Sequence, residues 1–134
     1  MSVTKIDSDV VEINNSVSTI FNYLSDFNNF EKLMPSQVTN WSSTTDECVF
    51  TINGMATICM KIIEKTPSTK ISIISNGKVP FEFKLFIYLT EKDATSSTGQ
   101  LAFESDLNPM LKMMVVKPLG NFFNMLAQKM KDIK

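Results

Sequence analysis

The strongest constraint on how this chain folds is a change of hydrophobic period along it. Between Cys48 and Leu89, apolar residues alternate with others in runs separated by turn residues such as Asn53-Gly54 and Asn76-Gly77. This alternation predicts strands with one buried face, and tight turns between them predict an antiparallel sheet. From Met110 to Lys131 the apolar residues recur every three or four positions, which predicts a long helix.

The remaining segments predict shorter elements. Asn14, Asn15 and Ser16 are typical of a turn and a helix start, and Pro35 ends a helical stretch. We expect a strand around Thr4–Ile13, a short helix containing Val17, Ile20, Phe21 and Leu24, helical turns near Asn29–Met34, strands over Val38–Trp41 and Gln100–Leu107, and a polar loop over 91–99.

The turn at Asn53-Gly54 determines how the strands around it pair. A two-residue turn would place Cys48 opposite Cys59 and would put Phe50 and Ile58 on opposite faces. Because both of those residues belong to apolar core patterns, we expect a loop with an odd number of residues. Gly54 is then predicted to take a positive φ, as in a bulge.

Composition is that of one globular unit. A length of 134 residues suits a single domain spanning 1–134, and 43% hydrophobic with 20% charged residues argues against disorder. No apolar run approaches the roughly 18 residues of a membrane span, so no integral membrane association is expected. The first residues lack the apolar core of a secretory signal, which favours a cytoplasmic protein. The oligomeric state is left open.

Residue types that are missing exclude several functions. All 13 basic residues are lysines, spread along a chain of net charge −1, so no nucleic-acid partner is expected. Without histidine the chain lacks the usual triads and the commonest metal ligand, so we predict no catalytic residue, metal or cofactor. Cys48 and Cys59 form neither a disulfide framework nor a zinc pattern.

The long C-terminal helix carries one apolar face. Pro109 suits its first position, whereas Pro118 lies in its interior and should kink it or start a new helix. A proline there also leaves the Met114 carbonyl without its usual donor. The predicted core face consists of Leu111, Met114, Val115, Leu119, Phe122, Leu126 and Met130.

A single helix cannot cover the edges of a wide sheet, so the sheet must curl around it and leave a space between the two. Two polar residues are candidates there: Glu64, which continues the inward alternation, and Trp41, whose two alternative positions are the mouth of the pocket and a cap on the core. The predicted lining is apolar: Phe50, Ile52, Ile58, Met60, Ile62, Phe81, Phe83, Leu85, Ile87, Phe103, Met114 and Phe122.

The pattern resembles a known superfamily. The segments IFNYLSDFNNFEKLMP (Ile20–Pro35), CVFTINGMATICMKI (Cys48–Ile62), PFEFKLFIYL (Pro80–Leu89) and LNPMLKMM with KPLGNFFNMLA (within Leu107–Ala127) look like the SRPBCC superfamily. Its members are START-like and Bet v 1-like helix-grip proteins related to polyketide cyclases. The resemblance implies an α+β fold, with about seven antiparallel strands around the C-terminal helix and two short helices after the first strand.

Three functions are compatible with this pattern. The first is binding or transport of a small hydrophobic molecule, such as a lipid, isoprenoid or polyketide, between the sheet and the helix. The second is an enzyme of the cyclase or dehydrase kind, which needs a polar group in the cavity. The third is a protein-interaction module with a filled core. Since no catalytic motif is present, we favour a function other than catalysis.

Overall fold

The computed structural model describes residues 3–53, 56–77, 79 and 81–133, and an antiparallel sheet is its largest element. Eight strands form the sheet in the order β1-β8-β7-β6-β5-β4-β3, and β2 pairs with β8 beside β1. The strands are β1 (Thr4–Asp7), β2 (Val11–Ile13), β3 (Val38–Ser43), β4 (Glu47–Ile52), β5 (Ala56–Thr66), β6 (Lys70–Ser75), β7 (Lys84–Asp93) and β8 (Ser96–Ser105).

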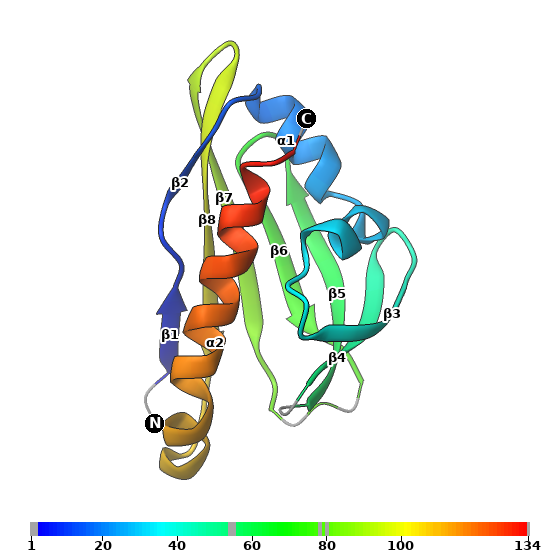
Figure 1. Cartoon of the computed structure of the whole chain (residues 1–134), viewed down its shortest axis with the longest axis vertical. Helices are drawn as coiled ribbons and strands as arrows, with labels where there is room; N and C mark the ends of the chain where they lie inside the picture. The colour runs from blue at the N-terminus through cyan, green and yellow to red at the C-terminus, as the bar shows by residue number, and fades with distance from the viewer. Residues whose placement is uncertain (1–2, 54–55, 78, 80, 134) are drawn as a thin grey trace.

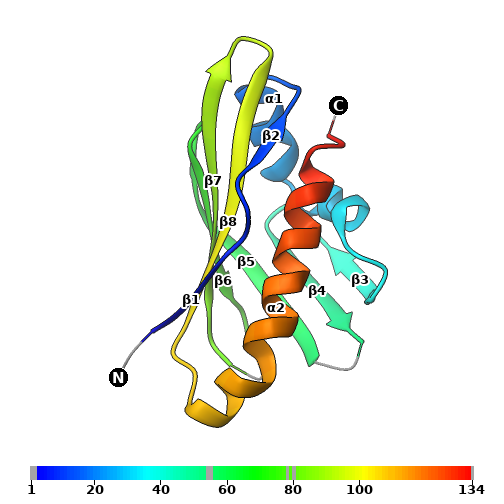
Figure 2. The same ribbon diagram turned by 60° about the vertical axis from the view of Figure 1, so that its left-hand side comes forward.

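Three helical elements complete the fold: α1 (Val17–Leu24), the 3-10 helix η1 (Phe27–Leu33) and α2 (Pro109–Met130). The sheet curves around α2, which runs along its concave face (Figures 1 and 2). In Figure 1, α1 and the helical turns after it lie to the right of α2, and β1 lies to its left. The predicted helix-grip arrangement, with two short helices after the first strands, is therefore confirmed.

Both α-helices begin at residues that satisfy their first backbone donors. The Ser16 hydroxyl accepts a hydrogen bond from Thr19 N, and the Asn108 carboxamide oxygen accepts one from Leu111 N at 2.9 Å. Pro109 follows at the first position of α2. The helix continues without a break through Pro118, so the alternative of a new helix starting there is wrong.

The pairing of β4 with β5 confirms the register predicted for this hairpin. Ile52 pairs with Ala56 across a loop of three residues, and Phe50 pairs with Ile58. Cys48 lies opposite Met60 rather than opposite Cys59. Phe50 and Ile58 are therefore buried on one face of the sheet. The prediction for Gly54 itself falls outside the described residues.

Three predicted boundaries differ from the structure. The first strand is divided at Ser8, which hydrogen-bonds to Leu101 through both its N–H and its Oγ. The predicted polar loop over 91–99 is mostly strand, because the β7–β8 ladder continues until Asp93 pairs with Ser96. Exposed Ser and Thr side chains do not prevent this backbone pairing. β7 begins at Lys84 rather than near residue 81.

Burial along α2 is uneven. Phe123 and Ala127 join the predicted face in the core, whereas Met114 is 65% exposed and only Val115 is buried before Leu119. The first turns of α2 project past the end of the sheet, as the lower part of Figure 1 shows, and therefore have no strand to cover.

Candidate ligand-binding site

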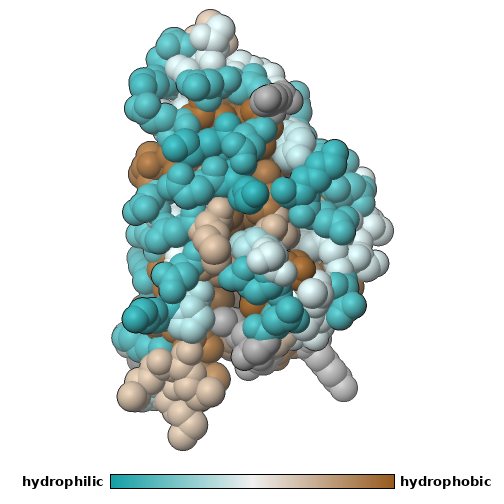
Figure 3. Space-filling view, in the orientation of Figure 1, coloured by the Kyte–Doolittle hydropathy of each residue, from teal (hydrophilic) through white to brown (hydrophobic). Residues whose placement is uncertain are grey.

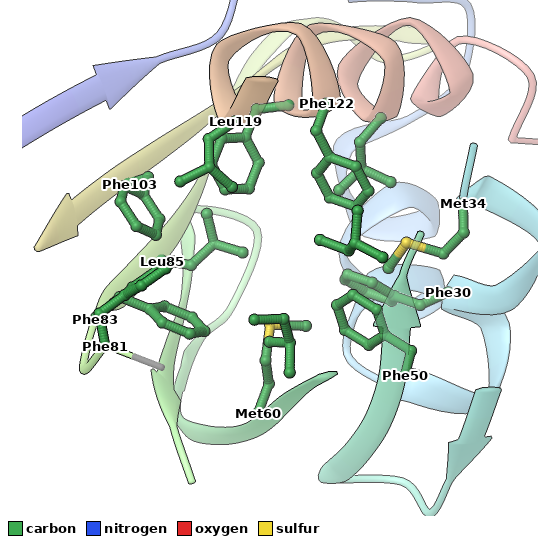
Figure 4. A pocket seen from close by; sticks show the side chains of 14 residues that line it. Phe30, Met34, Phe50, Met60, Phe81, Phe83, Leu85, Phe103, Leu119 and Phe122 are labelled. Atoms are coloured by element: carbon green, nitrogen blue, oxygen red, sulfur yellow. The ribbon is translucent and has the colours of Figure 1, made fainter. Parts of the chain in front are cut away.

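A small apolar cavity lies between the concave face of the sheet and α2. Its volume is about 30 Å³, and Figure 4 shows its side chains converging from the sheet, α2 and η1. All fourteen lining residues are apolar: Phe30, Met34, Phe50, Ile52, Ile58, Met60, Phe81, Phe83, Leu85, Phe103, Leu119, Phe122, Phe123 and Leu126.

Aromatic rings fill most of the space on the β7–β8 side. The Phe103 ring is stacked on Phe83, with centroids 5.5 Å apart, and lies 5.3 Å from Phe123. Phe81 meets Phe103 edge-on at 6.2 Å, and Phe122 meets Phe123 edge-on at 5.6 Å. Such pairs add roughly 0.5–1.5 kcal/mol beyond their burial, so this wall is held firmly.

The cavity is too small for a ligand in this conformation. A volume of about 30 Å³ has room for a water molecule or two, whereas a pocket that takes up benzene measures roughly 150 Å³. A trapped water needs two to four polar partners, and the lining side chains provide none. The cavity is therefore dry, and a ligand can enter only if side chains move.

An open groove of about 470 Å³ lies outside this cavity. It runs between α2, from Leu111 to Met125, and residues of β4 and β5. Its described lining is Gln37, Ile52, Asn53, Ala56, Phe81, Leu111, Met114, Val115, Pro118, Asn121, Phe122 and Met125. Figure 3 shows apolar side chains along the middle of this face, between the α2 side and the β3–β4 side.

Three side chains belong to both spaces. Ile52, Phe81 and Phe122 line the cavity on one side and the groove on the other, and each is at most 9% exposed. They therefore lie between the two spaces.

The structure brings most of the predicted lining residues together. The cavity includes nine of them: Phe50, Ile52, Ile58, Met60, Phe81, Phe83, Leu85, Phe103 and Phe122. Ile62 and Ile87 are buried on the same face but lie farther along their strands, outside the lining. Met114 lies in the groove and not in the cavity.

Glu64 does not reach the cavity, which corrects the prediction that it faces inward. A bulge after Ile62 shifts the pairing of β5, so that Ile62 lies opposite Ile73 but Glu64 lies opposite Ser72. The inserted residue changes which face later side chains occupy. The Glu64 carboxylate is exposed, accepts a hydrogen bond from Ser72 Oγ and lies 3.4 Å from Lys70 Nζ.

Trp41 supports the cavity from behind without lining it. Its ring is stacked on Phe50, with centroids 5.3 Å apart, and its Nε1 donates a hydrogen bond to Ser43 Oγ at 3.0 Å. Since Phe50 is a lining residue, Trp41 fixes one wall.

Residues of η1 and of the inner half of α2 line the cavity without having been predicted to do so. Phe30 and Met34 close the end of the cavity near η1, and Phe123 lies beside Phe122 on the helix. The sequence did contain a signal for the η1 side of the cavity: Phe27, Phe30 and Leu33 are spaced about one helical turn apart, which predicts one buried face. All three side chains are buried in the structure.

The titratable groups with shifted pKa values lie outside the cavity lining. Burial raises the pKa of the Cys48 thiol to about 12, so it is a neutral, unreactive core residue at pH 7. The hydrogen bond from Lys92 lowers the pKa of Glu12, and this pair is fully exposed. Within the described residues, no cluster of three or more His, Cys, Asp or Glu residues could hold a metal ion.

No family model matches the chain, and no curated protein sequence matches it either. Solved structures do match. A START superfamily protein from Mycobacterium smegmatis has a TM-score of 0.76 at 13% identity, covering 96% of this chain and 94% of its own. Norcoclaurine synthase from Thalictrum flavum, in complex with dopamine and hydroxybenzaldehyde, has a TM-score of 0.75 at 13% identity, covering 98% and 86%. A protein from Thermus thermophilus has a TM-score of 0.76 at 9% identity, covering 96% and 95%.

These similarities identify the fold. The chain has the SRPBCC-type architecture of START-like and Bet v 1-like proteins, as its sequence pattern indicated. Such a fold is consistent with ligand binding but specifies neither a ligand nor a reaction. Across the described part of the chain, no helix combines the length and the apolar character needed to cross a bilayer.

Proposed function

Starting from this SRPBCC-type fold, we propose that the protein binds a small apolar molecule between the sheet and α2, with the groove as its entrance. One observation carries the proposal: the groove and the small apolar cavity share three lining side chains, Ile52, Phe81 and Phe122. A ligand that displaces the two rings gains access to the apolar interior. Lipids, isoprenoids and polyketides are the candidate classes.

Apolar burial would provide the driving force for such an opening. Burying roughly 200 Å² of apolar ligand surface contributes about 5 kcal/mol at about 25 cal/mol per Å². Association and the turning of the rings reduce this gain. The open conformation is then a minor state that the ligand stabilises, because the ligand binds it better than the closed one.

An enzyme of the cyclase or dehydrase kind receives less support from this site. Acid–base catalysis needs a titratable group within hydrogen-bonding reach of the substrate. The described cavity lining provides only hydrocarbon and thioether side chains, and the groove adds only carboxamides.

A protein-interaction module is the second candidate, and one observation favours it. The interior is almost filled, and Met110, Met113 and Met114 are 72%, 87% and 65% exposed at the start of α2. Figure 3 shows a pale brown patch at its lower left, where α2 begins in Figure 1. Flexible thioether side chains adapt to varied apolar partners.

The test has two parts. Native mass spectrometry of protein purified from its own host should detect a bound apolar molecule, and a panel of apolar compounds should raise the melting temperature. Met114→Glu, which places a charge in the groove, should abolish the thermal shift. The matched control is Met113→Glu, on the same turn but outside the groove lining, which should preserve it.

The outcomes separate the two candidates. If no compound binds, or if both variants still bind, the groove is not the entrance and the proposal fails. If a partner protein is captured and Met113→Glu releases it, the interaction module is favoured.

A further inference from the structure

Three carboxamide side chains lie in the otherwise apolar groove. Gln37 comes from the segment before β3, Asn53 from the β4–β5 turn and Asn121 from α2. They therefore approach the groove from three separate parts of the chain. None of the described groove-lining residues carries a charge.

These groups have unused hydrogen-bonding capacity. A carboxamide offers two N–H donors and a carbonyl acceptor. The Asn53 oxygen accepts a hydrogen bond from Thr39 Oγ1 at 3.3 Å, whereas the side chains of Gln37 and Asn121 have no partner within the described part of the chain. They are available to a ligand.

The backbone of α2 supplies a further acceptor beside them. Pro118 has no N–H, so the hydrogen bond that the Met114 carbonyl would accept in a regular helix is missing. Both Met114 and Pro118 line the groove. A ligand hydroxyl can replace the missing donor.

The groove, whose described lining is uncharged, favours ligands with a neutral head group over ligands with a charged one. A carboxylate or ammonium that leaves water for this groove loses hydration and finds no opposite charge on the described lining. A neutral hydroxyl, carbonyl or amide group loses less, and carboxamides can pair with it as donor or acceptor.

We infer that the ligand is an apolar molecule with an uncharged hydrogen-bonding head group, held at the groove by Gln37, Asn53 and Asn121. This inference rests on the proposed function, because it concerns the ligand of the same site. The apolar body points toward the wall formed by Phe81 and Phe122, and the head group leaves water to lie against the carboxamides of the groove.

The experiment compares probes that share one apolar body. Naphthalene, 2-naphthol, naphthalene-2-carboxamide, 2-naphthoate and naphthalene-2-methylammonium are titrated at pH 7 by calorimetry. The alcohol and the amide should bind at least about tenfold more tightly than the anion and the cation. Equal or tighter binding of either charged probe overturns the inference.

Naphthalene, which has no head group, distinguishes a failure of this inference from a failure of the proposed function. If naphthalene binds but the head groups make no difference, the inference fails and the proposed function stands. If none of the five probes binds, both fail.

Variants at the exposed position 121 test the mechanism. Asn121→Leu should remove the preference for 2-naphthol over naphthalene. Asn121→Lys should strengthen 2-naphthoate binding by about tenfold. Gln128→Lys is the matched control, because it adds the same charge to the same helix outside the groove lining. If the control has the same effect, the selectivity does not arise at the groove and the inference is wrong.

Discussion

The two halves of α2 belong to one helix but have different surroundings. From Leu119 to Met130 the helix packs on strands and buries Leu119, Phe122, Phe123, Leu126, Ala127 and Met130. From Met110 to Pro118 it buries only Val115, and its first turns project past the end of the sheet. The second half, which we call the packed half, therefore holds the fold together. The first half, which we call the open half, contributes Leu111, Met114, Val115 and Pro118 to the groove, beside Asn121, Phe122 and Met125 of the packed half.

The largest expected effect is in the packed half. Leu126→Ala removes a side chain that is 2% exposed, and it should lower the free energy of unfolding by about 3 kcal/mol. Met113→Ala, in the open half, should change it by less than about 0.5 kcal/mol. Urea denaturation measures both. A loss below about 1 kcal/mol for Leu126→Ala would contradict the division of the helix.

Two glycines provide a smaller, paired comparison. A Cβ on Gly99 would lie 3.1 Å from Met130 Cε and 3.3 Å from Ile13 Cδ1, so Gly99→Val should destabilise the protein by about 2 kcal/mol. Gly120, inside α2, has only Ile6 Cγ2 nearby, at 3.8 Å. Gly120→Ala should therefore stabilise the protein by about 1 kcal/mol, because alanine favours helix. Thermal unfolding measures both shifts, and a stabilising Gly99→Val would show that the packing there is loose.

Phe122, in the packed half, lines both the groove and the cavity and tests how the two spaces are separated. Phe122→Leu thins the wall between groove and cavity, so an apolar probe should bind about tenfold more tightly and associate faster. The variant should lose about 1–2 kcal/mol of stability. Phe123→Leu enlarges the cavity but does not touch the groove, and it should leave the association rate unchanged. Stopped-flow fluorescence measures the association rate of the probe with each variant. Equal association rates would show that the ligand does not enter past Phe122.

The smallest effect concerns Cys48, on the same strand face as the lining residues Phe50 and Ile52. Burial raises the pKa of its thiol from 9.0 to about 12. The folded state therefore keeps a proton that the unfolded state releases, and the resulting stability is complete below pH 9 and is lost as pH rises toward 12. Between pH 9 and pH 10 the loss is about 1 kcal/mol.

The control for this pH dependence is Cys48→Ala, which should lack that part of the decrease in urea denaturation at the two pH values. An identical decrease in both proteins would mean that water reaches the inner face of β4 from the groove.

The sequence predicted those parts of the fold that depend on the hydrophobic pattern of neighbouring segments. The pairing of Phe50 with Ile58 followed from two alternating patterns that had to share one face. The position of Glu64 was not predictable, because the bulge after Ile62 has no distinct residue signal. The exposure of Met114 depends on where the sheet ends relative to α2, which no local pattern encodes.

The candidate site was likewise predicted in part. Strand residues that alternate inward were assigned to the cavity from the sequence alone, whereas the wall shared with the groove depends on how Phe81 and Phe122 meet in space. The carboxamides of Gln37, Asn53 and Asn121 were missed because they lie far apart in the chain and belong to no motif.

The position of β1 beside β8 has a consequence for biosynthesis. Thr4 pairs with Ser105, so β1 leaves the ribosome before its partner β8 and can pair with it only after about a hundred more residues have been made. Contacts so distant in sequence form slowly. Until then, the edges of β1 and the partly built sheet remain unpaired, which is when a nascent chain is most prone to aggregate. The lysines in and beside these strands, Lys5, Lys84 and Lys92, place charge on those edges during that interval.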